Sequence, residues 1–155
     1  MNIRNYIIKI SSTFFYIGYL PFIPGTFGSL AGLFLFYLLK GSIAVYLLFV
    51  LPLIILGYMV AGKAEEIFQQ KDARCIVIDE VCGMLLSLIF IPADLKLALI
   101  AFIIFRLLDA LKPYPAGLLQ DLKGSIGVMS DDIVAGIYTN IVLQVAFRLV
   151  SFKTS

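Results

Sequence analysis

Long apolar runs constrain this chain more than any other feature of its sequence. Residues 43–61 contain no charged side chain, and further apolar runs with few charges occupy 27–39, 75–92, 97–111 and about 131–150. A helix that spans a bilayer needs about 20 such residues. Only 14% of the 155 residues are charged, whereas a soluble domain has about a quarter. Because helices satisfy their own backbone hydrogen bonds in lipid, we predict an all-α integral membrane helical bundle of about four to five spans.

The N-terminal region differs from these runs. Arg4 and Lys9 are followed by SSTFFYIGYLPFIPG, which lacks the apolar core and the small-residue cleavage site of a signal peptide. Residues 2–17 instead predict an amphipathic helix that lies in the membrane interface. Because a chain of this length rarely divides, we expect a single membrane-embedded domain over residues 1–155. No pattern in the sequence predicts a particular oligomeric state.

The distribution of basic residues predicts the orientation. If the N-terminus is cytoplasmic and five runs alternate, the cytoplasmic side holds more Lys and Arg than the other side, as the positive-inside rule requires. The cytoplasmic set is Arg4, Lys9, Lys63, Lys71, Arg74, Arg106, Lys112 and Lys123, and the opposite set is Lys40, Lys96, Arg148 and Lys153. The chain is therefore predicted to be a multi-pass protein of a cytoplasmic membrane.

This orientation brings four polar motifs to one membrane face. They are PGTFGS before the first run, Asp79 and Glu80 at the start of the third, Arg106 and Asp109 at the end of the fourth, and Asp131 and Asp132 at the start of the fifth. Carboxylates at membrane depth are costly and usually functional. A candidate site is therefore expected at the cytoplasmic face.

Each motif also has a structural interpretation. Ser130 could cap a helix, with Asp131 and Asp132 at the positive end of its dipole. Arg106 and Asp109 could form an ion pair three residues apart. Adjacent helical residues point about 100° apart. Asp131 and Asp132 could therefore both reach one ion, or one could bind a metal while the other holds a lysine.

The glycine-rich motif PGTFGSLAG, residues 24–32, also allows two interpretations. Small residues permit close packing of membrane helices. Alternatively, Thr26 and Ser29 supply hydroxyl groups near a helix start, where a phosphate can bind. The motif is not a Walker A loop, because no G-K-[ST] sequence occurs.

The combination of motifs favours phosphate chemistry. Asp79, Glu80, Asp109, Asp131 and Asp132 form an all-oxygen ligand set, which suits Mg²⁺, or Mn²⁺ or Ca²⁺, rather than zinc. Arg106, Lys112 and Lys123 would offset part of the negative charge and bind phosphate. The same five carboxylates are the candidate catalytic groups.

Several phosphatase chemistries are excluded by composition. The chain has no histidine, no C-x₅-R motif and no D-x-D triplet. The phosphatase chemistry that remains is attack by a water molecule activated by a metal, with a carboxylate as the base. The net charge of +2 and the lack of a basic stripe argue against nucleic acid. A cation channel or transporter would need carboxylates distributed along the membrane depth. A structural membrane subunit would use its charges only as caps and ion pairs.

Three motifs together resemble a known family. FIPGTFGSLAG, IDEVCGM and FRLLDALKPYP…KGSIGVMSDDIVAG are similar to those of the phosphatidylglycerophosphatase A family of bacterial membrane phosphatases. The resemblance implies an all-helical, Mg²⁺-dependent enzyme of the bacterial inner membrane. Its expected substrate is a phospholipid in the bilayer, phosphatidylglycerophosphate, whose terminal phosphate monoester is hydrolysed to give phosphatidylglycerol and phosphate. Another lipid phosphate, such as phosphatidic acid, is the alternative substrate.

Overall fold

The fold is built from helices. The computed structural model describes residues 2–153, and the side chains of residues 2–148. Within that range there is no strand. The elements are α1 (Ile3–Ser12), the 3₁₀ helix η1 (Ile17–Tyr19), α2 (Pro24–Leu39), α3 (Ile43–Phe68), α4 (Ile78–Ser87), α5 (Leu95–Leu111), α6 (Ala116–Gln120) and α7 (Ser125–Lys153). The predicted all-α class is confirmed.

Two of these helices are long and apolar enough to cross a membrane: α3 and residues Ser125–Arg148 of α7. Only 22% of the most apolar stretch of α3 is buried within the protein, and Leu48, Ile55 and Met59 are each more than half exposed. An exposed apolar surface of this extent is typical of a helix that contacts lipid or another protein. Helices α2 and α5, with 16 and 17 residues, are shorter than a full span.

Helix α4 lies at the centre of the bundle. It has ten residues, and Val81, Cys82, Met84 and Leu85 are completely buried. Its neighbours approach closely because both interfaces contain glycine. A Cβ on Gly32 of α2 would lie 2.8 Å from the Val81 carbonyl oxygen, and one on Gly136 of α7 would lie 2.4 Å from that of Gly83. Small residues thus allow the backbones of α2, α4 and α7 to pack together.

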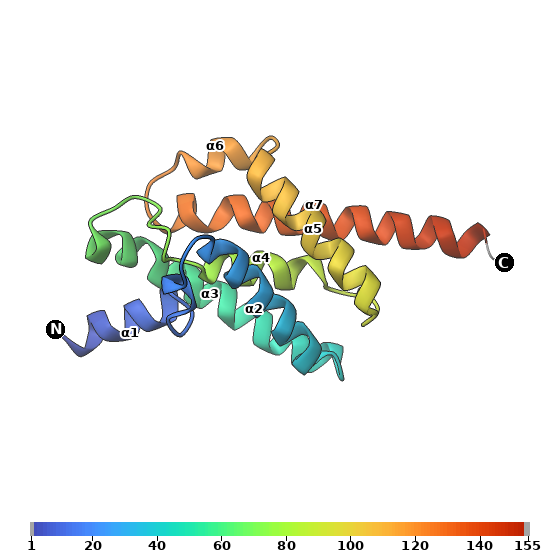
Figure 1. The fold of residues 1–155 in the computed structure, drawn as a ribbon, viewed down its shortest axis with the longest axis horizontal. Coiled ribbons are helices and arrows are strands. Elements are labelled where there is room, and N and C mark those ends of the chain that lie inside the picture. The colour runs from blue at the N-terminus through green and yellow to red at the C-terminus, as the bar shows by residue number, and fades with distance from the viewer. Residues whose placement is uncertain (1, 154–155) are drawn as a thin grey trace.

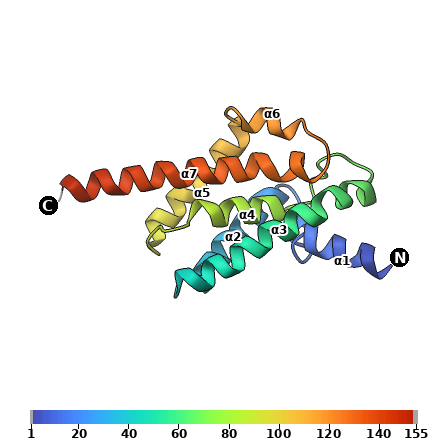
Figure 2. The ribbon, with the colours of Figure 1, turned by 180° about the vertical axis from the view of Figure 1, so that it is seen from behind.

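The helix ends place the polar motifs together. Figures 1 and 2 show the starts of α2, α4 and α7 and the end of α5 at the same end of the bundle, near α1 and α6, while the α2–α3 turn lies at the other end. The structure therefore gathers the four motifs at one end, as alternating runs predict.

Three boundaries differ from the sequence expectation. Helix α7 begins at Ser125, so Asp131 and Asp132 lie about two turns into the helix. The helix-capping interpretation of Ser130 is therefore wrong. The Ser130 hydroxyl instead forms a hydrogen bond of 3.0 Å with the Tyr58 hydroxyl. Helix α4 ends at Ser87 and does not fill the apolar run 75–92. The N-terminal amphipathic helix ends at Ser12 rather than at residue 17, because Phe14, Phe15 and Tyr16 have left-handed backbone conformations.

Candidate active site

Three carboxylates form an acidic cluster inside the protein. Oxygen atoms of Asp79, Glu80 and Asp132 all lie within 4.8 Å of one another. Asp79 and Asp132 are each only 4% exposed. Glu80 Oε2 and Asp132 Oδ1 are buried without a hydrogen-bond partner among the described residues. Unpaired buried carboxylates repel one another and lose hydration, so the geometry favours a bound cation.

The three residues meet because of how α4 is placed. Asp79 and Glu80 lie in the first turn of α4, where the helix dipole favours negative charge. Asp79 Oδ1 also accepts a hydrogen bond of 3.1 Å from the Glu80 N–H. Asp132 comes from α7, whose backbone passes so close to α4 that a Cβ on Gly83 would lie 2.7 Å from the Asp132 carbonyl oxygen. The glycine contacts thus bring the third carboxylate to the first two.

Gly25 of the PGTFGS motif contacts this cluster directly. A Cβ at that position would lie 2.1 Å from Glu80 Oε1 and 3.6 Å from an Arg106 guanidinium nitrogen. Ser29 is fully buried, and its hydroxyl donates a 3.0 Å hydrogen bond to the Gly25 carbonyl oxygen. To donate to a phosphate, Ser29 would have to release that bond. Thr26 is partly exposed in the first turn of α2.

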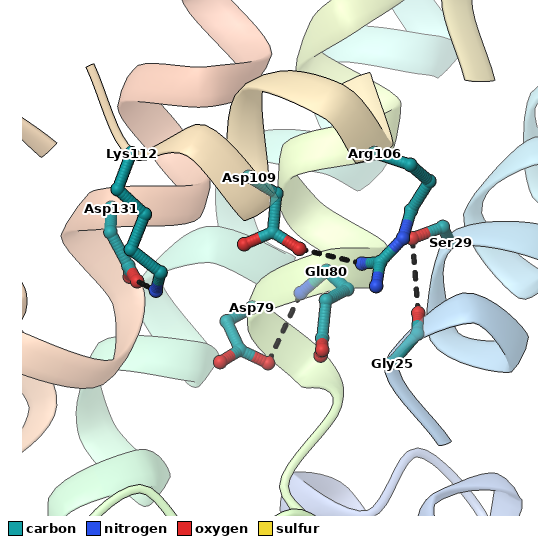
Figure 3. A network of polar contacts seen from close by, with 8 residues as sticks. All are labelled: Gly25, Ser29, Asp79, Glu80, Arg106, Asp109, Lys112 and Asp131. Carbon is teal, nitrogen blue, oxygen red and sulfur yellow. Dashed lines mark hydrogen bonds and ion pairs between the residues drawn. The ribbon is translucent and has the colours of Figure 1, made fainter. Parts of the chain in front are cut away.

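The other two predicted carboxylates, Asp109 and Asp131, form ion pairs with basic side chains, as Figure 3 shows. Arg106 donates to Asp109 Oδ2 at 2.7 Å, within the last turns of α5. Lys112, which follows α5, pairs with Asp131 of α7. Burial alone would lower the pKa of Lys112, but its hydrogen bond to Asp131 and the nearby negative charges outweigh burial and raise the pKa. Asp131 and Asp132 therefore point to different partners.

Not every predicted phosphate ligand joins the cluster. Arg106 lies beside Glu80 and Gly25 (Figure 3). Lys123 is exposed in the turn that precedes α7, and no contact of its side chain with the cluster is found in the described structure. Its role in phosphate binding stays a prediction.

An open pocket of about 370 Å³ adjoins the acidic cluster. Its wall includes Glu80, Arg106 and Gly25, together with Phe22, Ile23, Pro24, Asp72, Arg74 and Ile76. Our sequence interpretation omitted Asp72 and Arg74 from the site. Both lie in the segment that leads directly into α4, and this proximity to Asp79 and Glu80 was the available signal.

The residues present fit a hard divalent cation. Asp79, Glu80 and Asp132 offer only oxygen donors, and two of their oxygens have no other partner in the described part of the chain. Mg²⁺ sites in phosphate-processing enzymes typically combine a few carboxylates with water and substrate oxygens. An open pocket with an arginine lies next to these donors. The arrangement can therefore hold a phosphate monoester against a cation.

A helical bundle with two helices apolar enough to span a membrane, and with a buried acidic cluster beside an arginine, fits an enzyme that handles phosphate. Residues 10–147 match the family described as Phosphatidylglycerophosphatase A. The chain belongs to this family, and it is therefore a phosphatase. The resemblance predicted from the motifs is confirmed.

Three relatives show the extent of the similarity. Proteins named Phosphatidylglycerophosphatase A from Escherichia coli and Haemophilus influenzae are each 36% identical to the chain over 77% of its length. The aligned part covers 72% of the Escherichia coli protein and 76% of the Haemophilus influenzae protein. A Bacteroides thetaiotaomicron protein, provisionally named a phosphatidylinositol-3-phosphatase, is 32% identical over 83% of this chain and 86% of its own length. No solved structure matches the chain.

Proposed function

We propose that this phosphatase hydrolyses the terminal phosphate monoester of phosphatidylglycerophosphate, releasing phosphatidylglycerol and phosphate, and that it requires Mg²⁺. The observation that carries the proposal is that Glu80 of the acidic cluster lines one pocket with Arg106 and Gly25. The names of two relatives that align with most of the chain support the substrate.

In this proposal Asp79, Glu80 and Asp132 hold the cation. When bound, Mg²⁺ would supply positive charge to the phosphate oxygens and make a water molecule more acidic. Arg106 binds the phosphate through its planar guanidinium group, which suits two oxygens at once. Asp109 keeps Arg106 in position through its 2.7 Å contact. The cation and Arg106 would thus be held in place to stabilise the negative charge of the phosphate, including the charge that develops during hydrolysis.

A carboxylate at the cluster accepts the proton of the attacking water. Asp131 is a second candidate for this role, because its Oδ1 is buried and has no hydrogen-bond partner among the described residues, while its Oδ2 is held by Lys112. Lys112 would then offset the negative charge of Asp131. The glycerol oxygen takes up a proton as its bond to phosphorus breaks. The lipid tails remain in the bilayer.

We further propose that this end of the bundle faces the cytoplasm in a bacterial inner membrane. The excess of Lys and Arg on the loops at this end supports that orientation. The helix ends that carry these carboxylates lie at one end of the bundle (Figure 1), whereas a cation transporter would need carboxylates along its depth. Phosphatase chemistry is the better explanation of the cluster.

Hydrolysis of a phosphate monoester on an inositol lipid is a second candidate, favoured by the name and the 86% coverage of the Bacteroides relative. Phosphate release by the purified protein from phosphatidylglycerophosphate, phosphatidylinositol 3-phosphate and phosphatidic acid, each with Mg²⁺ and with chelator, separates these possibilities. We expect Mg²⁺-dependent turnover to be fastest with phosphatidylglycerophosphate. Faster turnover of either other lipid would assign a different substrate. Undiminished activity in the presence of chelator would reject the proposed requirement for Mg²⁺.

A further inference from the structure

The pocket contains a second arginine that the hydrolysis itself does not need. Arg74 lines the same pocket as Glu80 and Arg106 but is exposed, whereas those two are partly buried. Arg106 is neutralised by Asp109. Among the side chains of residues 2–148, no carboxylate lies within ion-pair distance of Arg74. Asp72 lines the same pocket but forms no ion pair with Arg74. A guanidinium group without an ion-pair partner at the edge of a pocket can bind an anion.

The backbone that carries Arg74 is held in place on both sides. The Val77 N–H donates to the Ser12 carbonyl oxygen at 3.0 Å, and the Ile76 N–H donates to that of Ala73 at 2.7 Å. Gly18 packs so tightly against this segment that a Cβ there would lie 1.9 Å from the Cys75 carbonyl oxygen. The backbone at Arg74 is thus held in a fixed position beside the pocket.

The outer wall also contains two exposed apolar side chains, beside the exposed Asp72. Phe22 is 94% exposed and Ile23 is 56% exposed, and both line the pocket. Exposed apolar side chains at a membrane protein's polar end favour contact with lipid. The pocket therefore has Glu80 and Arg106 at its partly buried inner side and Arg74 on its exposed side. Its rim carries Phe22 and Ile23 together with Asp72.

This sequence of groups matches the order of groups in a glycerophospholipid headgroup that carries a terminal phosphate. Such a lipid has a phosphate monoester at its tip, a glycerol unit, a phosphodiester and finally the acyl chains. We propose that Arg74 binds the phosphodiester of the substrate while the monoester lies at the acidic cluster, so that Arg74 is a specificity-determining residue. The inference rests on the proposed function, and it predicts preference for lipids with two phosphates over phosphatidic acid, which has no diester.

Direct binding tests the proposal without turnover. Dihexanoyl phosphatidylglycerol contains the diester but no monoester, and inorganic phosphate resembles only the monoester. Calorimetric titration of both ligands, with Mg²⁺ present, would compare the wild type with Arg74→Gln and Arg74→Lys. The matched control is Lys63→Gln, which removes one exposed positive charge outside the pocket. Dihexanoylglycerol, which lacks phosphate, controls for apolar binding.

We expect Arg74→Gln to weaken phosphatidylglycerol binding about tenfold, the effect of one charge-assisted hydrogen bond, and to leave phosphate binding unchanged. Arg74→Lys should retain part of the affinity, and Lys63→Gln should match the wild type. Failure of the wild type to bind phosphatidylglycerol, unchanged binding in Arg74→Gln, or equal weakening of both ligands would overturn the assignment.

Kinetics distinguish this inference from the proposed function. If the proposed function holds, Arg74→Gln should raise KM for phosphatidylglycerophosphate about tenfold and keep kcat within about twofold. Turnover of phosphatidic acid, where measurable, should not change. A wild-type protein that binds phosphatidylglycerol through Arg74 but releases no phosphate from phosphatidylglycerophosphate would reject the proposed function alone. A loss in kcat rather than KM would reject the assignment of Arg74.

Discussion

Replacing Gly25 by alanine should separate activity from stability. The added Cβ would lie 2.1 Å from Glu80 Oε1, and Cβ contacts below 3.0 Å essentially do not occur. The Glu80 carboxylate must therefore retreat by about 0.9 Å, the difference between those two distances. A misplacement of about 1 Å at a reacting centre can lower the rate about 100-fold. We expect a loss of that order in kcat/KM for phosphate release.

The same change should not unfold the protein. The atoms that the added methyl group would meet are the ends of the flexible Glu80 and Arg106 side chains rather than backbone. Alanine is also favoured over glycine in a helix by up to about 1 kcal/mol. We therefore expect the melting temperature in detergent to stay the same or rise slightly while activity falls.

Two further substitutions complete the test. Gly41→Ala is the neutral control, because nothing lies within 4 Å of a Cβ there. Gly32→Ala is the stability control, because its Cβ would lie 2.8 Å from the Val81 backbone oxygen, and it should lower the melting temperature. Activity of Gly25→Ala within about threefold of the wild type, far from the expected loss, would refute the placement of Glu80 in the site. A melting temperature as low as that of Gly32→Ala would show that Gly25 is a packing residue.

Three other predictions address orientation, phosphate binding and the cation. Single cysteines at Gln70 and Leu122, in a variant without the native cysteines, should resist membrane-impermeant thiol reagents applied outside sealed cells; rapid labelling of both would reverse the proposed orientation. Arg106→Lys should lose most turnover while the protein stays folded, because lysine cannot form a planar fork, and near-normal kcat/KM would leave Arg106 only as the ion-pair partner of Asp109. Asp132→Asn should increase the Mg²⁺ concentration for half-maximal activity about tenfold, as expected when one charged ligand or its support is lost, with little change in melting temperature. An unchanged Mg²⁺ dependence would remove Asp132 from the proposed cation site.

The sequence determined the class of this protein because the relevant signals are local. Apolar runs such as residues 43–61 indicate helices in lipid whatever their neighbours are. The motifs FIPGTFGSLAG, IDEVCGM and FRLLDALKPYP…KGSIGVMSDDIVAG can be read from the sequence, and together they predicted the family that residues 10–147 match. The alternation of runs also predicted that these motifs would share one end of the bundle. Successive spanning helices run in opposite directions, so the end of one span and the start of the next lie on the same side of the membrane.

Only the tertiary structure decided how the charges are partnered. Asp131 and Asp132 are neighbours in sequence, yet one pairs with Lys112 and the other joins Asp79 and Glu80. Because successive helical residues point about 100° apart, the outcome depends on the rotation of α7 about its axis. That rotation is set by the close packing of Gly83 and Gly136, which residue spacing alone does not reveal. The position of Arg74 beside the pocket likewise depends on contacts between the segment before α4 and the distant residues Ser12 and Gly18.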